Sequence, residues 1–344
     1  MNAAEGVAGS LTEADVSGAD HHDVDLIIVG AGPVGLYGAY YAGFRGFSIA
    51  ILDSLSEPGG QVAAMYPEKQ IYDVAGFPAV KGQHLVANLV EQADPFHPLY
   101  LLGHQAEKLD RSAEDEVEIT THKGTHVTAR AIVITGGMGT FTPRPLPNAA
   151  EFEGRGLQYF VPDLEALRDL DVLIVGGGDS AFDWAHNLEP IARSIKLIHR
   201  RDKFRAHEHT VKQVLDSSVE VLTFTEVAHI TGDGKVERVE VYNKQSRERR
   251  VLEVQAVVAA LGFTADLGPL KEWGLELDKR HIIVDTTMAT NLPRVFAAGD
   301  ITEYAGKVRL ISVGFGEVAT AVNNAAPVID PSLRLFPGHS SNLE

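Results

Sequence analysis

The feature that most constrains the fold of this chain is a strand–turn–helix pattern that occurs twice. In the first copy, an apolar run at residues 25–29 enters the turn Gly30-Ala-Gly32-Pro-Val-Gly35, and a helical segment then extends to about Arg45. A second apolar run at residues 47–52 ends at Asp53. Glycines in such a turn allow a tight bend, close approach of the backbone to a pyrophosphate, and close packing of the helix on the strand. The pattern predicts a βαβ unit that binds a dinucleotide.

The second copy begins 146 residues after Gly30. An apolar run at residues 171–175 enters Gly176-Gly-Gly178-Asp-Ser-Ala181, and a helical stretch precedes a strand at residues 194–198. Alanine can replace the third glycine, because that position chiefly needs a small side chain. One such motif alone is also typical of an ordinary connection between elements. Two copies in matching contexts predict an α/β fold with two Rossmann-like dinucleotide-binding domains.

The segment at the end of the second strand differs in charge between the two copies. Its first residue lies 23 positions after the first glycine in both, where it faces the adenosine ribose. In the first copy it is Asp53, whose carboxylate can bind a ribose diol but repels a 2′-phosphate, so FAD or NAD fits. In the second copy it begins His199-Arg200-Arg201, with Arg205 nearby, and these donors favour NADP. Register with the glycine motif favours this role over that of a solvated basic segment.

A third candidate lies near the C-terminus, where Arg294-Val-Phe-Ala-Ala-Gly299-Asp300 predicts an apolar strand that ends in Gly-Asp. The carboxylate could approach the ribityl or pyrophosphate part of a dinucleotide, because glycine leaves room for the backbone. Alone, the segment would be a strand end followed by a turn.

Composition excludes several kinds of chemistry. The chain of 344 residues has no cysteine, which rules out thiol nucleophiles, disulfide frameworks and cysteine-ligated metal centres. His207-Glu-His209 lacks the i, i+4 spacing of a metal pair, so we expect no metal site. The net charge of −17 argues against nucleic-acid or anionic-membrane partners. No apolar run approaches the ~18 residues of a membrane span, and we expect a cytoplasmic protein.

Together these motifs resemble those of the two-dinucleotide flavoproteins of the thioredoxin reductase family. Longer segments are similar to the thioredoxin-reductase-type ferredoxin–NADP reductases: Gly59–Lys69, Tyr72–Pro78, Asp202–Glu208 and Pro337–Ser340. The similarity covers nearly everything after residue 22. It implies that FAD binds beside Asp53 and that NADP binds beside the arginines.

The resemblance also implies roles for individual residues. Tyr66 would stack on one face of the flavin and His339 would cover the other, as the two residues at the reacting ring. A core aromatic and a tail residue are the respective alternatives. The remaining FAD contacts that the resemblance implies, besides the glycines, are Asp53, Gln61, Ala106, Phe141, Asp300 and Ser341.

The resemblance departs from the thioredoxin reductases at one chemical group. Those enzymes carry a redox-active Cys-x-x-Cys just before the second glycine motif, where this chain has Phe160-Val-Pro-Asp163. The flavin itself must then release the electrons. The resemblance implies a homodimer that transfers a hydride between NADPH and FAD, and single electrons between FAD and ferredoxin or a flavodoxin-like protein. An NADPH-dependent flavin or quinone reductase and a non-catalytic redox sensor remain alternatives.

The second unit is expected to be inserted in the first, because two apolar runs, at residues 131–134 and 256–261, each lead to a glycine at which the chain can cross between domains. We place the FAD-binding domain at residues 23–139 and 262–344 and the NADPH-binding domain at residues 140–261. Residues 1–22 are expected to form a flexible acidic tail, and residues from about 330 to 344 a segment that caps the flavin.

Overall fold

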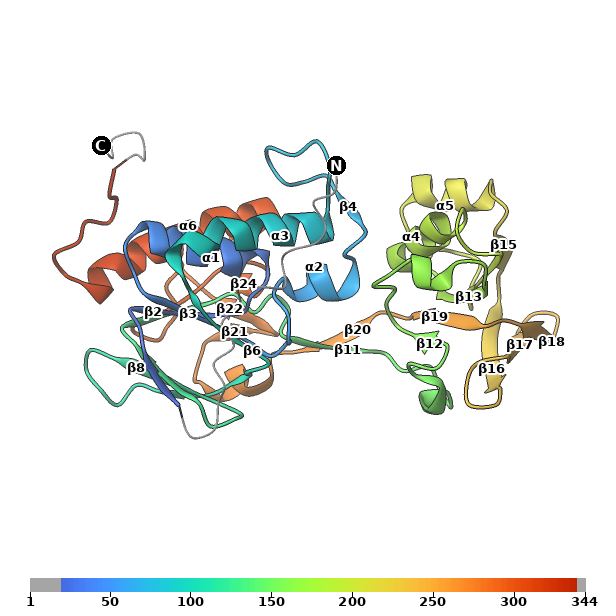
Figure 1. Ribbon diagram of the computed structural model, residues 1–344, viewed down its shortest axis with the longest axis horizontal. Coiled ribbons are helices and arrows are strands. Elements are labelled where there is room, and N and C mark those ends of the chain that lie inside the picture. Colours follow the sequence, from blue (N-terminus) through green and yellow to red (C-terminus); the bar gives the residue numbers. More distant parts are fainter. Residues whose placement is uncertain (1–19, 339–344) are drawn as a thin grey trace. The chain divides into compact units, whose positions relative to one another are not determined.

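The chain divides into two compact units in the computed structural model, which describes residues 20–338. Unit 1 is built from two stretches of sequence that end at Thr140 and resume at Ala265, and unit 2 spans Phe141–Thr264. The chain passes between them in two paired strands, β11 (Thr140–Pro143) and β20 (Phe263–Asp266) (Figure 1). Unit 2 is therefore inserted in unit 1.

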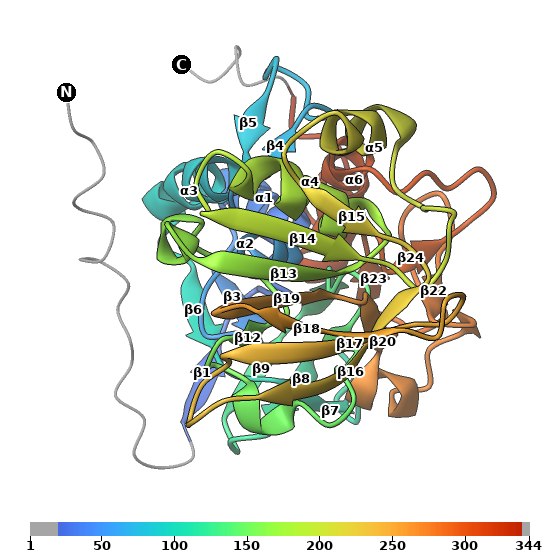
Figure 2. The same ribbon diagram turned by 90° about the vertical axis from the view of Figure 1, so that its right-hand side faces the viewer.

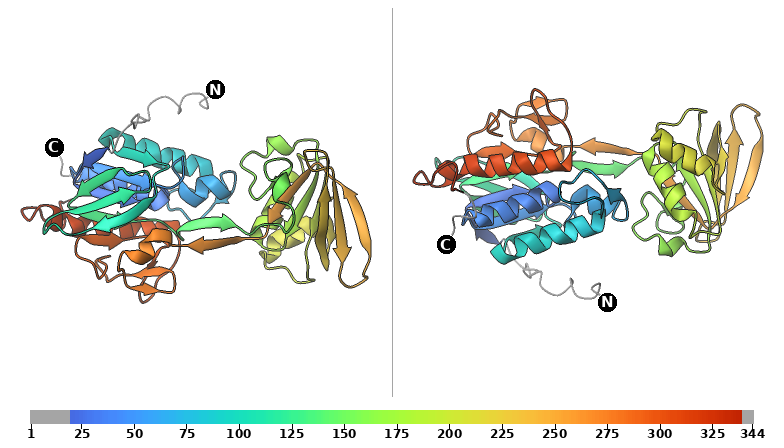
Figure 3. Two further views of the ribbon diagram at one scale, coloured as in Figure 1. Left: turned by 90° about the horizontal axis from the view of Figure 1, so that it is seen from below. Right: turned by 90° about the horizontal axis from the view of Figure 1, so that it is seen from above.

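Unit 1 contains a five-stranded parallel sheet of order β23-β10-β2-β3-β6. In that order the strands are Val295–Ala297, Ala131–Ile134, Leu26–Val29, Ile49–Asp53 and Leu99–Leu102. One face is covered by helices α6 (Ile311–Ile329), α1 (Pro33–Phe44) and α3 (Gly82–Ala93), which lie side by side (Figure 3). The apolar strands are buried, as expected for a parallel sheet covered by other elements.

Smaller elements complete unit 1. The sheet β1-β9-β8-β7 consists of His21–Asp23, His126–Ala129, Val117–Thr121 and Ala106–Asp110. A third sheet, β21-β22-β24, consists of Leu277–Asp278, His281–Ile283 and Thr302–Glu303. Helix α2 (Gly60–Met65) and the hairpin β4–β5 (Gln70–Ile71, Val80–Lys81) follow β3. Strand β1 begins before residue 23, where the folded chain was expected to start, because its backbone pairs with β9.

Unit 2 repeats this architecture. Its parallel sheet has order β12-β19-β13-β14-β15, formed by Leu157–Gln158, Ala256–Ala260, Asp171–Gly176, Ser194–Ile198 and Glu220–Leu222 (Figure 2). Helices α4 (Asp179–Leu188) and α5 (Glu208–Leu215) follow β13 and β14. An antiparallel sheet consists of β16 (Thr225–Thr231), β17 (Arg238–Asn243) and β18 (Arg249–Glu253).

Alternating side chains of β13 pack into two separate cores. Val172 and Ile174 belong to the cluster that contains Phe182 of α4, whereas Leu173 and Val175 pack with the apolar side chains of β16–β18. Both faces of the strand are therefore buried, which explains why its sequence reads as a continuous apolar run. The architecture of both units confirms the predicted α/β class with two Rossmann-like folds. In residues 20–338 no helix has the length and apolar character needed to cross a bilayer.

Candidate functional site

The glycine-rich turn of unit 1 connects β2 to the N-terminus of α1. Gly30 has φ +117°, and a Cβ at Gly35 would lie 1.9 Å from the carbonyl oxygen of Gly30. Only glycine fits both positions, because the helix packs directly on the turn. A Cβ at Gly32 would instead have no neighbour within 4 Å. The turn is thus crowded on the protein side and open at Gly32, at a helix N-terminus that favours anions, as a pyrophosphate requires.

The carboxylate of Asp53 is held at the end of β3 by backbone donors. Its Oδ2 accepts a hydrogen bond from the N–H of Ala31 at 2.6 Å, and its Oδ1 accepts one from the N–H of Leu55 at 2.8 Å. Burial raises the pKa of Asp53, and these N–H donors oppose that rise. The side chain is thereby fixed beside the glycine-rich turn with lone pairs left to accept hydrogen bonds from a ribose diol.

Helix α2 is attached to the same turn and carries two further candidates. The N–H of Gly59 donates to the carbonyl of Ala31 at 2.8 Å. Gln61 lies in α2, with its Nε2 3.5 Å from the Cβ position of Gly137, in the loop after β10. Tyr66 is the C-cap residue that directly follows α2. Backbone contacts to the turn therefore place both side chains at the carboxyl edge of the parallel sheet.

Tyr66 and Asp300 lie close enough to influence each other electrostatically. Burial raises the pKa of Tyr66, and the negative charges of Asp300 and Asp73 add to the rise. Burial also raises the pKa of Asp300, against the opposing charges of Lys307 and Arg309. The aromatic ring and the Gly-Asp carboxylate thus belong to one partly buried site in unit 1.

Of the remaining candidates in unit 1, the side chain of Ala106 is described by the structure, and those of Phe141, His339 and Ser341 are not. Ala106 begins β7 and is 7% exposed; it follows His104, whose N–H donates to the carbonyl of Asp53 at 2.7 Å. This contact places the start of β7 close to the end of β3, where Asp53 lies. Phe141 is in β11, but its side chain, like the whole of His339 and Ser341, lies outside the described residues.

The glycine-rich turn of unit 2 has the same pattern of crowded and open positions. A Cβ at Gly176 would lie 2.5 Å from the carbonyl oxygen of Ala260 and 2.9 Å from the Cβ of Ala181. A Cβ at Gly178 would meet nothing within 4 Å. As in unit 1, the second glycine leaves the N-terminus of the following helix open to an anionic ligand.

The basic segment after β14 folds back onto this turn. The imidazole Nδ1 of His199 would lie 2.3 Å from a Cβ at Gly177, and the N–H of Arg205 donates to the carbonyl of Gly177 at 2.7 Å. Burial lowers the pKa of His199, and the charges of the neighbouring arginines lower it further. Arg200, Arg201 and Arg205 are exposed, and among residues 20–338 none forms an ion pair. Their guanidinium groups are accessible to a phosphate.

Sequence reasoning missed several residues that support these sites. Phe204 packs on Phe182 with ring centroids 4.8 Å apart and returns the basic segment to α4. The carboxylate of Asp179 accepts a hydrogen bond from the N–H of His207 at 2.9 Å. In unit 1, Lys307 and Glu317 contact Gly299. For Lys307 and Glu317 the sequence did hold a signal, because Glu317 is the single charged residue in the sequence of α6.

Two glycine-rich turns of this geometry, each between a parallel strand and a helix, define a protein with two dinucleotide-binding folds. The chain belongs to the pyridine nucleotide-disulphide oxidoreductase family, whose model matches residues 24–325.

Named relatives narrow this family further. A ferredoxin–NADP reductase of Frankia alni is 64% identical over 316 residues, covering 92% of this chain and 98% of the relative. The ferredoxin–NADP reductase of Salinispora tropica is 62% identical, covering 93% and 99%. The solved thioredoxin reductase of T. acidophilum aligns with a TM-score of 0.74 at 26% identity, covering 88% of this chain and 98% of that chain. These similarities confirm the predicted resemblance.

Proposed function

We propose that this chain is an FAD-dependent ferredoxin–NADP reductase, with FAD bound by unit 1 and NADP(H) bound by unit 2. The observation that carries the proposal is the opposite charge of the segments that end the second strand in the two βαβ units. Asp53 in unit 1 accepts hydrogen bonds from a ribose diol, whereas Arg200 and Arg201 in unit 2 bind a 2′-phosphate. The names and high identity of the relatives support the same reaction.

The residues of unit 1 fit FAD in chemical type. The open position at Gly32 and the N-terminus of α1 accommodate a pyrophosphate. Asp53 and Asp300 supply carboxylates at separate points, and among residues 20–338 the Asp300 carboxylate has no hydrogen-bond partner. Tyr66 supplies a partly buried aromatic ring for stacking. FAD, when bound, exchanges two electrons with a nicotinamide and single electrons with a small redox protein.

The protein contributes binding and orientation rather than a nucleophile. The backbone donors to Asp53 fix the carboxylate that would bind the adenosine ribose, and Tyr66 would orient the flavin ring by stacking on it. Gln61 would lie beside the same ring. We extend the proposal to Ala106, Phe141, His339 and Ser341 as further FAD contacts.

The absence of cysteine from the sequence separates this activity from that of the family's disulphide reductases. No side chain here can form the dithiol that passes electrons to a disulfide. Electrons must therefore leave from the flavin directly, which suits a one-electron carrier such as ferredoxin or a flavodoxin-like protein.

Steady-state kinetics with different acceptors test the proposal. NADPH oxidation is measured with ferredoxin, with a quinone, with free flavin and with a thioredoxin disulfide as acceptor. We expect the highest kcat/KM with ferredoxin and no turnover with the disulfide. Preference for a quinone or free flavin would favour the alternative reductase, and no turnover with any acceptor would favour a redox sensor.

We further propose that the chain forms a homodimer in the cytoplasm. Its mass in solution tests the dimer.

A further inference from the structure

Lys307 and Glu317 form an ion pair that is almost completely buried, with side-chain exposures of 1% and 5%. Glu317 is the single charged residue in the sequence of α6, and Lys307 lies in the loop that precedes this helix. Burying two charges carries a desolvation penalty that an apolar pair of similar volume would avoid. The position of the pair in the fold therefore calls for an explanation besides stability.

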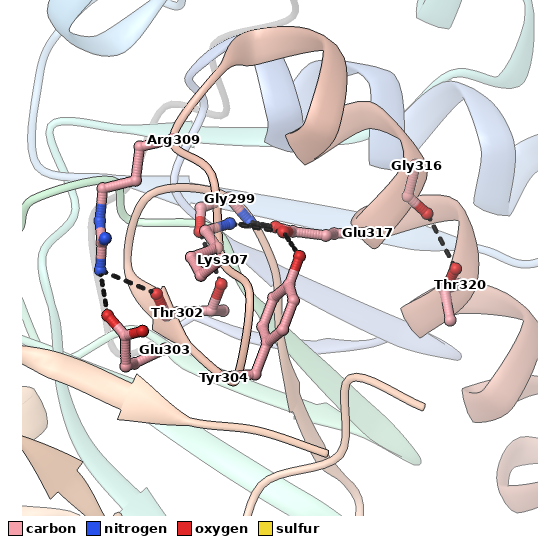
Figure 4. Close-up of polar contacts among 9 residues, drawn as sticks. All are labelled: Gly299, Thr302, Glu303, Tyr304, Lys307, Arg309, Gly316, Glu317 and Thr320. Carbon is pink, nitrogen blue, oxygen red and sulfur yellow. Dashed lines mark hydrogen bonds and ion pairs between the residues drawn. The ribbon is translucent and has the colours of Figure 1, made fainter. Parts of the chain in front are cut away.

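Both members of the pair bind the backbone of Gly299 (Figure 4). The N–H of Gly299 donates to Oε2 of Glu317 at 2.7 Å, and the Nζ of Lys307 donates to the carbonyl oxygen of Gly299 at 2.9 Å. Lys307 also donates to Oε2 of Glu317 at 2.7 Å. Hydrogen bonds with one ionised partner are stronger and shorter than neutral ones. Both backbone polar groups of one glycine are thus held by opposite charges.

Neighbouring groups restrict the same peptide further. The hydroxyl of Thr302 donates to the carbonyl of Gly299 at 2.8 Å, and that of Tyr304 donates to Oε1 of Glu317 at 2.6 Å. Gly299 has φ +85°, and a Cβ there would lie 3.2 Å from Val34 of α1. The pair therefore ties the end of β23 to α6, at a point in contact with the first turn of α1.

Asp300 follows this restrained glycine directly. In residues 20–338 its carboxylate has no hydrogen-bond partner, so its direction depends on the backbone conformation that precedes it. A nearby exposed pair, Arg309–Glu303, does not contact Gly299: Arg309 donates to the carbonyl of Thr302 and to Glu303. The buried pair and the hydroxyl of Thr302 therefore hold the backbone of Gly299, and the Arg309–Glu303 pair does not take part.

We infer that Lys307 and Glu317 are positioning residues that hold Gly299–Asp300 in the conformation that binds the ribityl or pyrophosphate part of FAD. The inference rests on the proposed function for the identity of the dinucleotide. The site then has two halves that bind different parts of the dinucleotide. Asp53 serves the adenosine end, and the ion pair serves the other end through Asp300.

The test compares FAD with AMP as ligands of the apoprotein. Lys307→Met removes the charge and keeps a similar length. We expect the Kd for FAD to rise at least about tenfold, because the loss of one hydrogen bond to a charged group changes an equilibrium constant by about tenfold or more. The Kd for AMP, which reaches only the adenosine end, should change by less than about twofold. Lys271→Met, which removes an exposed ion pair in the same unit, is the matched control and should change neither Kd.

Two further variants keep the inference testable if Lys307→Met does not fold. Glu317→Gln keeps the shape and one acceptor oxygen, and the same selective loss of FAD affinity is expected. Lys307→Arg keeps the charge and should retain more FAD affinity than Lys307→Met. In an Asp300→Asn background, Lys307→Met should add little, because the group that it positions has already been altered.

The possible outcomes separate the inference from the proposed function. If the unaltered chain binds no FAD, the proposed function is refuted, and the inference with it. If the unaltered chain binds FAD and both pair variants bind it equally well, only the inference is overturned. It is also overturned if FAD and AMP affinities fall by the same factor, which would indicate a general effect on the fold. Selective loss of FAD affinity supports it.

Discussion

Replacing Arg200 and Arg201 together with alanine should remove most of the preference for NADPH over NADH. Both side chains are exposed, and the structure pairs neither with an acid within residues 20–338. A hydrogen bond to a charged group contributes about 1.5–3 kcal/mol, and exposure places each arginine near the lower value. Two such contacts amount to about 3 kcal/mol, or about a 100-fold loss in kcat/KM with NADPH.

The loss should be in KM rather than in kcat, because the 2′-phosphate is remote from the reacting nicotinamide. Activity with NADH should change little. The matched control is Arg249→Ala with Arg250→Ala, an exposed consecutive pair in β18 of the same unit, which pairs with Glu240 and Glu220. Initial rates with both coenzymes give the four kcat/KM values. If the Arg200/Arg201 variant kept its NADPH preference, the assignment of unit 2 would be wrong.

Three other perturbations have defined outcomes. Gly32→Ala should change the free energy of unfolding of the apoprotein by less than about 0.5 kcal/mol but impair FAD binding. Gly35→Ala, whose Cβ would lie 1.9 Å from a backbone oxygen, should lower that free energy by about 3 kcal/mol or more. Thermal unfolding and flavin content measure both effects, and equal stabilities of the two variants would contradict the packing argument. Asp300→Asn should stabilise the apoprotein at neutral pH, since burial raises the pKa of Asp300. In the parent protein, protonated Asp300 stabilises the fold below its ordinary pKa of 3.8, and this stabilisation is lost as pH rises through the folded-state pKa. The variant should therefore gain in unfolding temperature over the parent as pH rises, and a difference that did not grow with pH would contradict the prediction. Deleting residues 337–344 should leave FAD bound but alter the rates of flavin reduction by NADPH and of reoxidation by oxygen in stopped-flow experiments; unchanged rates would remove His339 from the site.

The local sequence was enough to predict the parallel strands and both glycine-rich turns. Apolar runs such as residues 171–175 and the small residues at fixed positions after them follow from short-range requirements of backbone geometry. The charge difference between Asp53 and Arg200–Arg201 was readable for the same reason, because a single βαβ unit fixes the spacing.

The contacts that the folded loops make could not be predicted from the sequence. Lys307 and Glu317 meet Gly299 only because the loop between β23 and α6, and then α6 itself, return to the end of β23. The packing of His199 on Gly177 likewise depends on how the segment after β14 returns to α4. Hydrophobic periodicity carries no information on such long-range polar contacts, although a lone charge in an apolar helix marks where one is needed.

The absorption spectrum of the purified chain during anaerobic titration with NADPH tests the central claim most directly. The account predicts the visible bands of one FAD per chain, bleached by about one equivalent of NADPH and restored by oxidised ferredoxin. NADH should bleach them only at much higher concentration. A folded chain that showed no flavin bands and gained none on addition of FAD, or a bound flavin that NADPH failed to reduce, would contradict it.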